Sequence, residues 1–232
     1  MPQSYNFFPV GFIKSPYKEK FGIPRQARLV KSAQSTIELI SPCNDPSIIK
    51  GLESFSHLWL LFVFHAPKHE NWNPTVRPPR LGGNKRQGVF ATRSPFRPNP
   101  IGMSAVKLEK TEQKKGKIIL HISGADLLDG TPILDIKPYI RESDIIKNAQ
   151  DGWIKDKKHP QLSVSFSPIL KDFFKENEEL KKLITEVIKQ DPRPRYQESD
   201  SEESYAFRLE EHDVHFVIKG KKANVIEIKN PA

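Results

Sequence analysis

Short runs of apolar residues, separated by polar residues, fill the first 150 positions of the chain. Most of these runs are rich in β-branched or aromatic side chains and are bounded by Gly, Pro, Asn or Asp, a pattern typical of β-strands. The predicted strands span residues 10–14, 36–39, 58–64, 88–91, 103–108, 118–122 and 133–136. No long amphipathic helix interrupts them, so we expect antiparallel pairing. Closure into a barrel would remove the exposed sheet edges.

The pattern changes to helical spacing at Ser167. This residue suits a helix N-cap and Pro168 suits the first helical position, and apolar residues then recur every three or four positions to about Gln190. The prolines of residues 191–196 (DPRPRY) end this predicted helix. An acidic, Ser-rich stretch leads to predicted strands at residues 205–209, 214–218 and 225–228. We therefore predict a mainly β chain, with a β-barrel-like N-terminal domain at residues 1–155 and a small α+β C-terminal domain at residues 156–232.

Composition indicates a globular, intracellular protein. Hydrophobic residues make up 37% and charged residues 28% of the 232 positions, which excludes wholesale disorder and fibrous folds. The longest apolar run, residues 58–64, is far shorter than the roughly 20 residues of a membrane-spanning helix, and the first residues lack the build of a secretory signal. Cys43 is the single cysteine and cannot form an internal disulfide. We expect a cytoplasmic location and no membrane contact.

The basic charge lies in the N-terminal part. The net charge is +9, and residues 1–150 hold 22 Lys/Arg against 12 Asp/Glu, whereas residues 151–232 hold 15 against 16. Between Glu70 and Glu109 there is no acidic residue. This distribution favours an anionic partner, with nucleic acid the first candidate, although a basic surface that serves only solubility would look the same.

Residues 76–102 combine arginines with prolines and glycines. Proline fixes the backbone and glycine permits tight turns, so this loop can present guanidinium groups at fixed points. We expect an ordered site for phosphates or carboxylates, with Arg93 in a pocket and Arg86 and Arg97 nearer the surface. The alternative is a solvated charged loop.

Other polar residues give weaker signals. His65 ends an apolar strand, where it serves either a cleft or a structural hydrogen bond, and Pro67 separates it from His69, so we predict no metal site. Asp126, Asp129 and Asp135 lie in a segment of turns and short strands, where they could orient a base, a ribose or a neighbouring arginine, but the residues by themselves favour an ordinary tight turn. No nucleotide-binding or nucleophile motif is present.

Five motifs resemble the TsaA-like (TrmO) family. They are SPYKEKFGIPRQ (residues 15–26), LESFSHLWLLFVFH (residues 52–65), RPPRLGGNKRQGVFATRSPFRPNPIG (residues 77–102), GADLLDGTPILDIKPYI (residues 124–140) and DPRPRY (residues 191–196). The resemblance implies a β-barrel methyltransferase that uses S-adenosylmethionine and forms homodimers. It further implies methylation of the exocyclic nitrogen of threonylcarbamoyladenosine at position 37 of threonine tRNA, in the anticodon stem-loop.

The resemblance also implies a set of site residues. Those expected to bind S-adenosylmethionine are Pro24, Arg25, Gln26, His65, Ala66, Arg93, Met103, Asp126, Leu127, Leu128 and Asp129. Those assigned to the tRNA are Arg77, Arg80, Lys85, Arg86, Arg97 and Asn99. Backbone groups of the turn at residues 126–129 are expected to read the adenine, and Arg93 or Arg25 to hold the methionine carboxylate. No residue is assigned as the catalytic base; Asp126 and Asp135 are candidates.

The sequence departs from the family pattern at Ala27 and Arg28, where Pro-Gly is more common in the family. Two other functions remain open. One is a non-catalytic RNA-binding module that grips an anticodon arm, and the other is a methyltransferase for small molecules.

Overall fold

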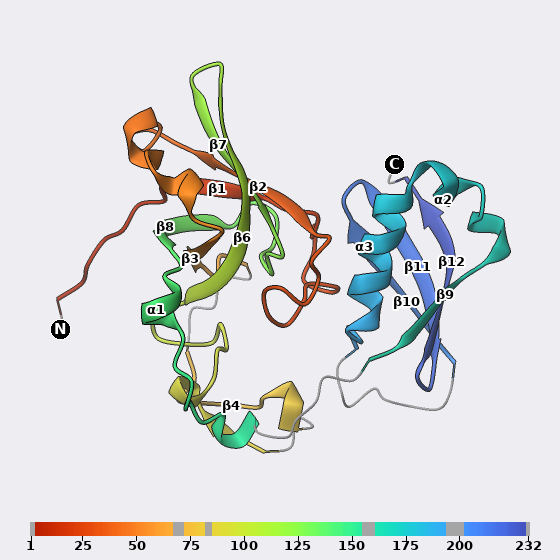
Figure 1. The fold of residues 1–232 in the computed structure, drawn as a ribbon. Coiled ribbons are helices and arrows are strands. Elements are labelled where there is room, and N and C mark those ends of the chain that lie inside the picture. Colours follow the sequence, from red (N-terminus) through yellow and green to blue (C-terminus); the bar gives the residue numbers. More distant parts are fainter. Residues whose placement is uncertain (1–2, 67–71, 82–84, 155–160, 194–201, 231–232) are drawn as a thin grey trace.

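The first part of the structure is a closed barrel. The computed structural model describes residues 3–66, 72–81, 85–154, 161–193 and 202–230 (Figure 1). In the described residues the barrel strands follow the order β1-β2-β7-β6-β3-β8, and each neighbouring pair is antiparallel. Their bounds are β1 Gly11–Lys14, β2 Gln34–Leu39, β3 His57–Val63, β6 Ile101–Lys114, β7 Lys117–Ser123 and β8 Pro132–Pro138. The predicted fold class is confirmed.

Strand β3 shows how the pattern of the sequence fills the barrel. Leu58, Leu60 and Phe62 are buried, whereas the residues between them are partly exposed. These three side chains belong to the same buried cluster as Ile13 and Leu120 from other strands. Successive side chains of a strand point to opposite faces, so one face of β3 faces the barrel core and the other faces outward.

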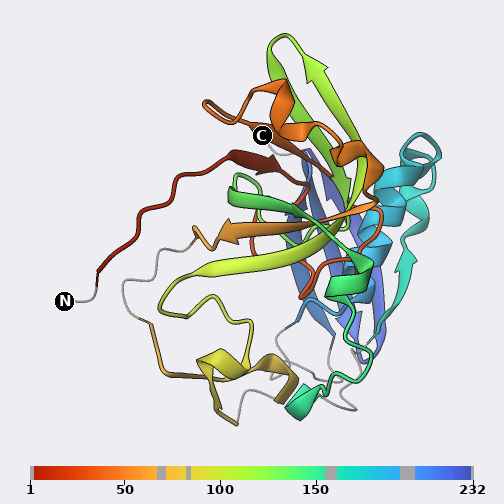
Figure 2. The same ribbon diagram turned by 60° about the vertical axis from the view of Figure 1, so that its left-hand side comes forward.

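Strand β6 is long enough to serve two neighbours. Its first half pairs with β3 and its second half with β7, and the pairing with β7 shifts register between Leu108 and Lys110. A β-bulge bends its strand. The β6–β7 hairpin extends away from the barrel in both views (Figures 1 and 2), while the opposite end of β6 remains close to β3.

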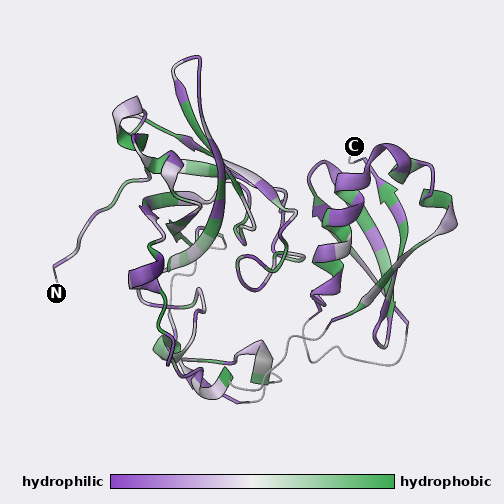
Figure 3. Cartoon of the chain, in the orientation of Figure 1, coloured by the Kyte–Doolittle hydropathy of each residue, from purple (hydrophilic) through white to green (hydrophobic). Residues whose placement is uncertain are grey.

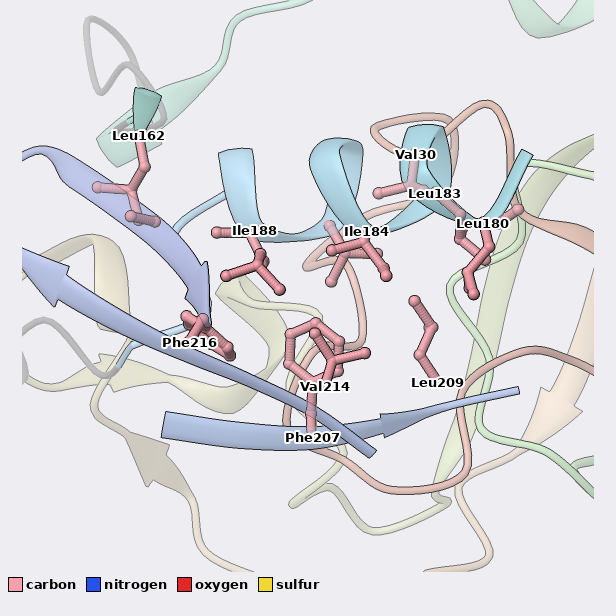
Figure 4. Packing of buried hydrophobic residues seen from close by; sticks show 14 of the residues in the cluster. Val30, Leu162, Leu180, Leu183, Ile184, Ile188, Phe207, Leu209, Val214 and Phe216 are labelled. Carbon is pink, nitrogen blue, oxygen red and sulfur yellow. The ribbon is translucent and has the colours of Figure 1, made fainter. Parts of the chain in front are cut away.

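The second part is a sheet with a helix on one face. The strand order is β10-β11-β12-β9, where β12 and β9 are parallel. The bounds are β9 Ser163–Phe166, β10 Glu203–Leu209, β11 His212–Lys219, β12 Lys222–Lys229 and the helix α3 Glu178–Lys189. Helix α3 is hydrophilic on much of its surface (Figure 3) and packs Leu183, Ile184 and Ile188 against the sheet residues Phe207 and Phe216 (Figure 4).

Short elements connect these larger ones. They are strands β4 Thr75–Val76 and β5 Gln87–Gly88, helices α1 Arg141–Asp144 and α2 Phe173–Glu176, and 3-10 turns at Pro46–Ile49, Leu52–Ser54, Pro79–Leu81, Val89–Ala91, Gly152–Ile154 and Pro168–Leu170. The predicted boundary between residues 155 and 156 lies outside the described residues. The two domain ranges therefore stay a prediction.

Two local expectations are wrong, and one strand is missed. The segment at residues 88–91 is a 3-10 turn after the short strand β5 and does not join the barrel. The helix expected from Ser167 to Gln190 is divided into a 3-10 turn at Pro168–Leu170, helix α2 and helix α3. Asn177, with φ −128° and ψ 47°, separates the two helices, and its side chain donates to the carbonyl of Phe173 at 2.8 Å. Strand β9 was not predicted, because it forms only by pairing with the distant strand β12.

Residues of the first part help to build the core of the second. Tyr17, Val30 and Ala33 are buried in the cluster that contains the α3 residues, and Figure 4 shows Val30 beside Leu183. Tyr17 also forms a β-bridge with Leu209. The two parts are therefore packed against each other through the segment between β1 and β2.

Gly11 lies in β1 where the barrel closes, and its Cα lies close to the backbone of β2. Strands β1 and β8 share the pairs Gly11 to Ile133 and Phe12 to Pro132, and a Cβ on Gly11 would lie 2.5 Å from the carbonyl oxygen of Glu38 in β2. We expect Gly11→Ala to lower the free energy of unfolding by about 1–3 kcal/mol, because a backbone strand must move to make room. Chemical denaturation of the full chain measures this.

The matched control is Gly88→Ala. A Cβ on Gly88 has no heavy atom within 4 Å, and the φ of −57° suits alanine. Its unfolding free energy should change little. Equal losses in both variants would contradict the steric role of the contact between Gly11 and the backbone of Glu38.

Candidate functional site

A cavity of about 780 Å³ lies against the ends of β3 and β6. Five segments line it: residues 20–28 (the wall loop), β3 with the residues that follow it, residues 92–99 (the arginine loop), the start of β6, and the turn at residues 126–131. Apolar walls come from Phe62, Ile101 and Leu127, and charged groups come from Arg93 and Asp126. Concave sites of this size with a few polar groups commonly bind small ligands.

Most residues expected at a cofactor site line this cavity. They are Pro24, Arg25, Gln26, His65, Ala66, Arg93, Met103, Asp126, Leu127 and Leu128. Asp129 does not line it, because its carboxylate accepts from the amide of Ser15 at 2.8 Å and pairs with Lys18 at 2.9 Å. Asp129 fixes the turn to the chain after β1.

The residues assigned to RNA divide into two groups. Arg97 and Asn99 line the cavity. Arg77, Lys85 and Arg86 are exposed and are not part of the cavity wall, and the side chain of Arg80 lies outside the described residues. His69 and Pro67 are outside them as well, and the described residues contain no group of three metal-ligating side chains.

The turn after β7 places Asp126 at the cavity. Gly124 has φ +74°, a conformation that favours glycine, and its carbonyl accepts from the amide of Arg28 at 2.7 Å. Ser15 donates from its hydroxyl to the carbonyl of Leu127 at 2.7 Å. The turn is thus bonded both to the wall loop and to the residues after β1.

Asp126 has a perturbed carboxyl group. Burial raises its pKa, while the hydroxyl of Ser104, backbone amides including that of Ala27, and the charge of Arg93 act in the opposite direction. Ser104 donates to Asp126 Oδ1 at 2.6 Å. A desolvated carboxyl that faces a cavity is a frequent feature of functional sites.

Hydroxyl groups order the arginine loop. Thr92 donates to the carbonyl of Val89 at 2.8 Å and accepts from the amide of Ser94 at 3.2 Å. Arg97 is half-buried, not at the surface as expected, and Nη1 donates to the carbonyl of Thr92 at 3.2 Å. Arg93 lines the cavity but is exposed.

Some cavity residues had no role in the expectations from sequence. Ser104 is 5% exposed on β6, in phase with the buried Val106 and Leu108, and a polar residue at a core position is the signal that could have identified it. Lys20 and Arg28 add positive charge to the wall loop. Burial lowers the pKa of Lys20.

Comparison with known proteins gives consistent matches along the chain. Residues 12–145 match a family model described as the tRNA-methyltransferase O N-terminal domain, and residues 159–231 match the TrmO C-terminal domain. The tRNA (adenine(37)-N6)-methyltransferase of Escherichia coli is 46% identical over 218 residues, which cover 92% of this chain and 93% of that protein. A Pseudomonas aeruginosa protein, whose name describes an S-adenosylmethionine-dependent methyltransferase, is 43% identical and 92% of each chain is covered.

A solved structure agrees with these matches. The crystal structure of TrmO from Pseudomonas aeruginosa superposes with a TM-score of 0.77 and 34% identity, covering 98% of this chain and 100% of that one.

In the described part of the chain, no helix combines the length and apolar character needed to cross a membrane.

The raised pKa of Asp126 predicts a pH-dependent effect on stability. The folded state binds the proton of the Asp126 carboxyl more tightly than an unfolded Asp with its usual pKa of 3.8 does. The free energy of unfolding of the unaltered chain therefore falls as the pH rises from 3.8 through the folded pKa of Asp126. Asp126→Asn removes this loss. Urea denaturation at a series of pH values compares Asp126→Asn with the unaltered chain. We expect no gain in the free energy of unfolding of the variant below pH 3.8 and the full gain above the folded pKa of Asp126.

Asp45→Asn is the matched control, because hydrogen bonds from Ser47 lower the pKa of Asp45. A lowered pKa stabilises the folded state as the pH rises from the folded pKa to the usual value of 3.8, so the stability lost in this variant should develop below pH 3.8 and change no further above it. The same response in both variants would contradict the assigned cause.

Proposed function

The chain belongs to the tRNA-methyltransferase O family, and on this premise we propose that it methylates N6 of adenine 37 in tRNA with S-adenosylmethionine as the methyl donor. We further propose that the adenine carries a threonylcarbamoyl group and that the tRNA is a threonine tRNA. The main support from the structure is the cavity, in which residues of four family-like motifs lie together. A cytoplasmic location, which agrees with a tRNA substrate, is part of this proposal.

The residues of the cavity fit the proposed cofactor chemically. S-adenosylmethionine offers an adenine ring, a methionine ammonium and carboxylate, and a sulfonium that supplies the methyl group. Phe62, Ile101 and Leu127 give apolar walls suited to a ring, and the volume of about 780 Å³ leaves room for a cofactor together with a substrate base. Asp126 can accept from an N–H group, and an arginine can bind a carboxylate with two parallel hydrogen bonds.

Arg93 is the arginine that we assign to the methionine carboxylate. It is exposed to the cavity, and among the described residues no hydrogen bond or ion pair engages its guanidinium. Arg25 is engaged elsewhere: its Nη2 donates to the carbonyls of Asp191 at 3.3 Å and Arg193 at 2.9 Å. Backbone groups at residues 126–128 are assigned to the adenine.

Positioning is the main catalytic task of this chain. The nitrogen of a ureido group is a poor nucleophile, so alignment with the methyl group should supply much of the rate. We assign this alignment to the residues that line the cavity. No general base is assigned to the reaction.

The basic surface outside the cavity is assigned to RNA. Arg86 is exposed, and Nη1 donates to the hydroxyl of Thr75 at 2.7 Å, which fixes the guanidinium between β4 and β5. Arg77 and Lys85 are exposed on the same segment. Such groups bind phosphates and make affinity depend on salt. The homodimer implied by the family resemblance stays a prediction.

Methylation of tRNA is the direct test. We expect nucleosides from purified threonine tRNA, incubated with the full chain and S-adenosylmethionine, to show threonylcarbamoyladenosine heavier by one methyl group in mass spectrometry. The matched control is the same tRNA without the threonylcarbamoyl group. Equal methylation of the control would overturn the proposed requirement for the threonylcarbamoyl group and would still support a tRNA methyltransferase. If the tRNA is not methylated and calorimetry detects no cofactor binding, the methyltransferase is overturned and the non-catalytic RNA-binding module is the function that remains.

Two arginines should separate cofactor binding from RNA binding. We expect Arg93→Ala to weaken binding of S-adenosylmethionine by about 10- to 100-fold, because a charge-assisted hydrogen-bond pair is lost. Arg86→Ala should leave cofactor binding unchanged and reduce the salt slope of tRNA binding by about 1. Calorimetry and filter binding at several salt concentrations measure both. Equal losses of both affinities in each variant would show that this division is wrong.

A further inference from the structure

Arg25 lies in the wall of the cavity, but its hydrogen bonds reach the second part of the chain. Its Nη2 donates to two carbonyl oxygens, of Asp191 and Arg193, which follow helix α3. The sequence separation exceeds 160 residues in both bonds. Two carbonyls at one guanidinium nitrogen give a charge-assisted contact between the wall loop and the turn at residues 190–193 (the α3 turn).

The α3 turn is built to hold those carbonyls still. Asp191 has φ +49°, and its carboxylate receives two hydrogen bonds from Arg193, from Nε and Nη2, each at 2.8 Å. Both residues are buried, with exposures of 3% and 4%. Arg193 Nη2 also donates to the carbonyl of Gly220 at 3.3 Å, so the turn is tied to the hairpin between β11 and β12. A buried pair with several hydrogen bonds fixes a single geometry.

Other contacts hold the segment after the wall loop against α3. The amide and the hydroxyl of Ser32 both donate to Glu186 Oε2 at 3.0 Å. Val30 packs into the cluster beside Leu183 (Figure 4). The segment from residue 25 to residue 32 therefore follows α3 from the turn at its end to its middle.

The arginine loop is also reached by a hydrogen bond from a residue that is distant in the sequence. The indole of Trp153 donates to the carbonyl of Ala91 at 2.9 Å, although 62 positions separate the two residues. Ala91 directly precedes Thr92 and Arg93, which line the cavity. Chain beyond the barrel thus contacts both the wall loop and the arginine loop.

We propose that Arg25 is a positioning residue that couples the docking of the C-terminal part to the shape of the cofactor cavity, and that its guanidinium does not bind the cofactor. The wall loop contributes Pro24, Gln26 and Ala27 to the cavity, and the position of these residues depends on the α3 turn. Cofactor affinity is then set partly by a contact outside the cavity. This inference rests on the proposed function, because it assigns the cavity to S-adenosylmethionine.

The first test needs no cofactor. In Arg25→Met, we expect amide hydrogen exchange of Arg28 and Asp191 to become about tenfold faster, since an opening that breaks the guanidinium contact costs less free energy. Both amides are hydrogen-bonded, to Gly124 at 2.7 Å and to Ile188 at 3.0 Å. A merely cofactor-binding arginine would leave exchange in the unliganded chain unchanged, and that result would overturn the proposal.

Arg208→Met is the matched control for the loss of a guanidinium. Arg208 pairs with Asp213 at 3.1 Å on the surface, with 46% of its side chain exposed. Exchange at Arg28 and cofactor binding should both remain as in the unaltered chain. A change as large as that of Arg25→Met would show that loss of any arginine loosens the structure, and would overturn the proposal.

The second test separates positioning from direct binding by a double-mutant cycle. Asp191→Asn with Arg193→Met removes the buried pair without leaving one charge unpaired, and Asn tolerates the left-handed backbone. Calorimetry with S-adenosylmethionine compares Arg25→Met, this turn variant, and their combination. We expect about tenfold weaker binding in each and little further loss in the combination, because one contact is broken in all three.

If the fold-losses in cofactor affinity of the two variants multiply in the combination, Arg25 acts on the cofactor independently of the turn. That result would overturn the proposal. If the turn variant does not fold, as judged by circular dichroism, the exchange result decides by itself. Absence of cofactor binding in the unaltered chain would instead overturn the proposed function, and faster exchange in Arg25→Met would still establish the contact.

Discussion

Hydrogen bonds from one connecting loop to two separate cores fix the cavity. The amide of Arg28 donates to the carbonyl of Gly124 in the barrel turn, whereas Arg25 and Ser32 reach the α3 turn and α3 itself. Neither core supplies both sets of partners, so the loop has its observed path only when the two parts are docked. The β-bridge between Tyr17 and Leu209 belongs to the same interface. The cavity is therefore a property of the whole chain, although barrel residues supply its floor.

The ionised carboxylate of Asp126 is unfavourable for folding, and a role in the functional site accounts for its presence there. Burial raises its pKa, and Ser104 and the charge of Arg93 offset only part of that cost. A neutral residue of the same shape would meet the same hydrogen-bond donors without the desolvation penalty. Positions at which local stability is given up are commonly functional. The position of Asp126 at the edge of a cavity with a cation opposite fits that explanation.

The sequence predicts those elements whose pattern is local, and misses those that depend on distant partners. Alternation of apolar residues locates β3 and β11, and the argument from exposed edges leads to the closed barrel. Strand β9 is missed because its four residues become a strand only beside β12. The helix break at Asn177 depends on a side-chain bond to the preceding turn, which competes with helical continuation. In the site, the family-like motifs identify most lining residues, but the partners of Asp129 and Arg25 follow from tertiary contacts that no spacing reveals.

The arginines around the cavity differ in their roles: Arg97 and Arg25 hold backbone segments, whereas Arg93 is the arginine proposed to bind the ligand. Arg97 donates to carbonyls of the arginine loop, and Arg25 donates to carbonyls of the α3 turn; each holds a wall in place. Thr92 and Ser94 order the arginine loop further through their hydroxyl groups, so proline and glycine are not alone responsible for its shape. This order allows Arg93 to be exposed and yet have a defined position near Asp126, where its charge offsets part of the rise in pKa that burial causes. A rigid backbone with one exposed guanidinium loses little entropy when an anion binds. The proposed binding of a carboxylate by Arg93 therefore depends on the position of this side chain more than on the total positive charge.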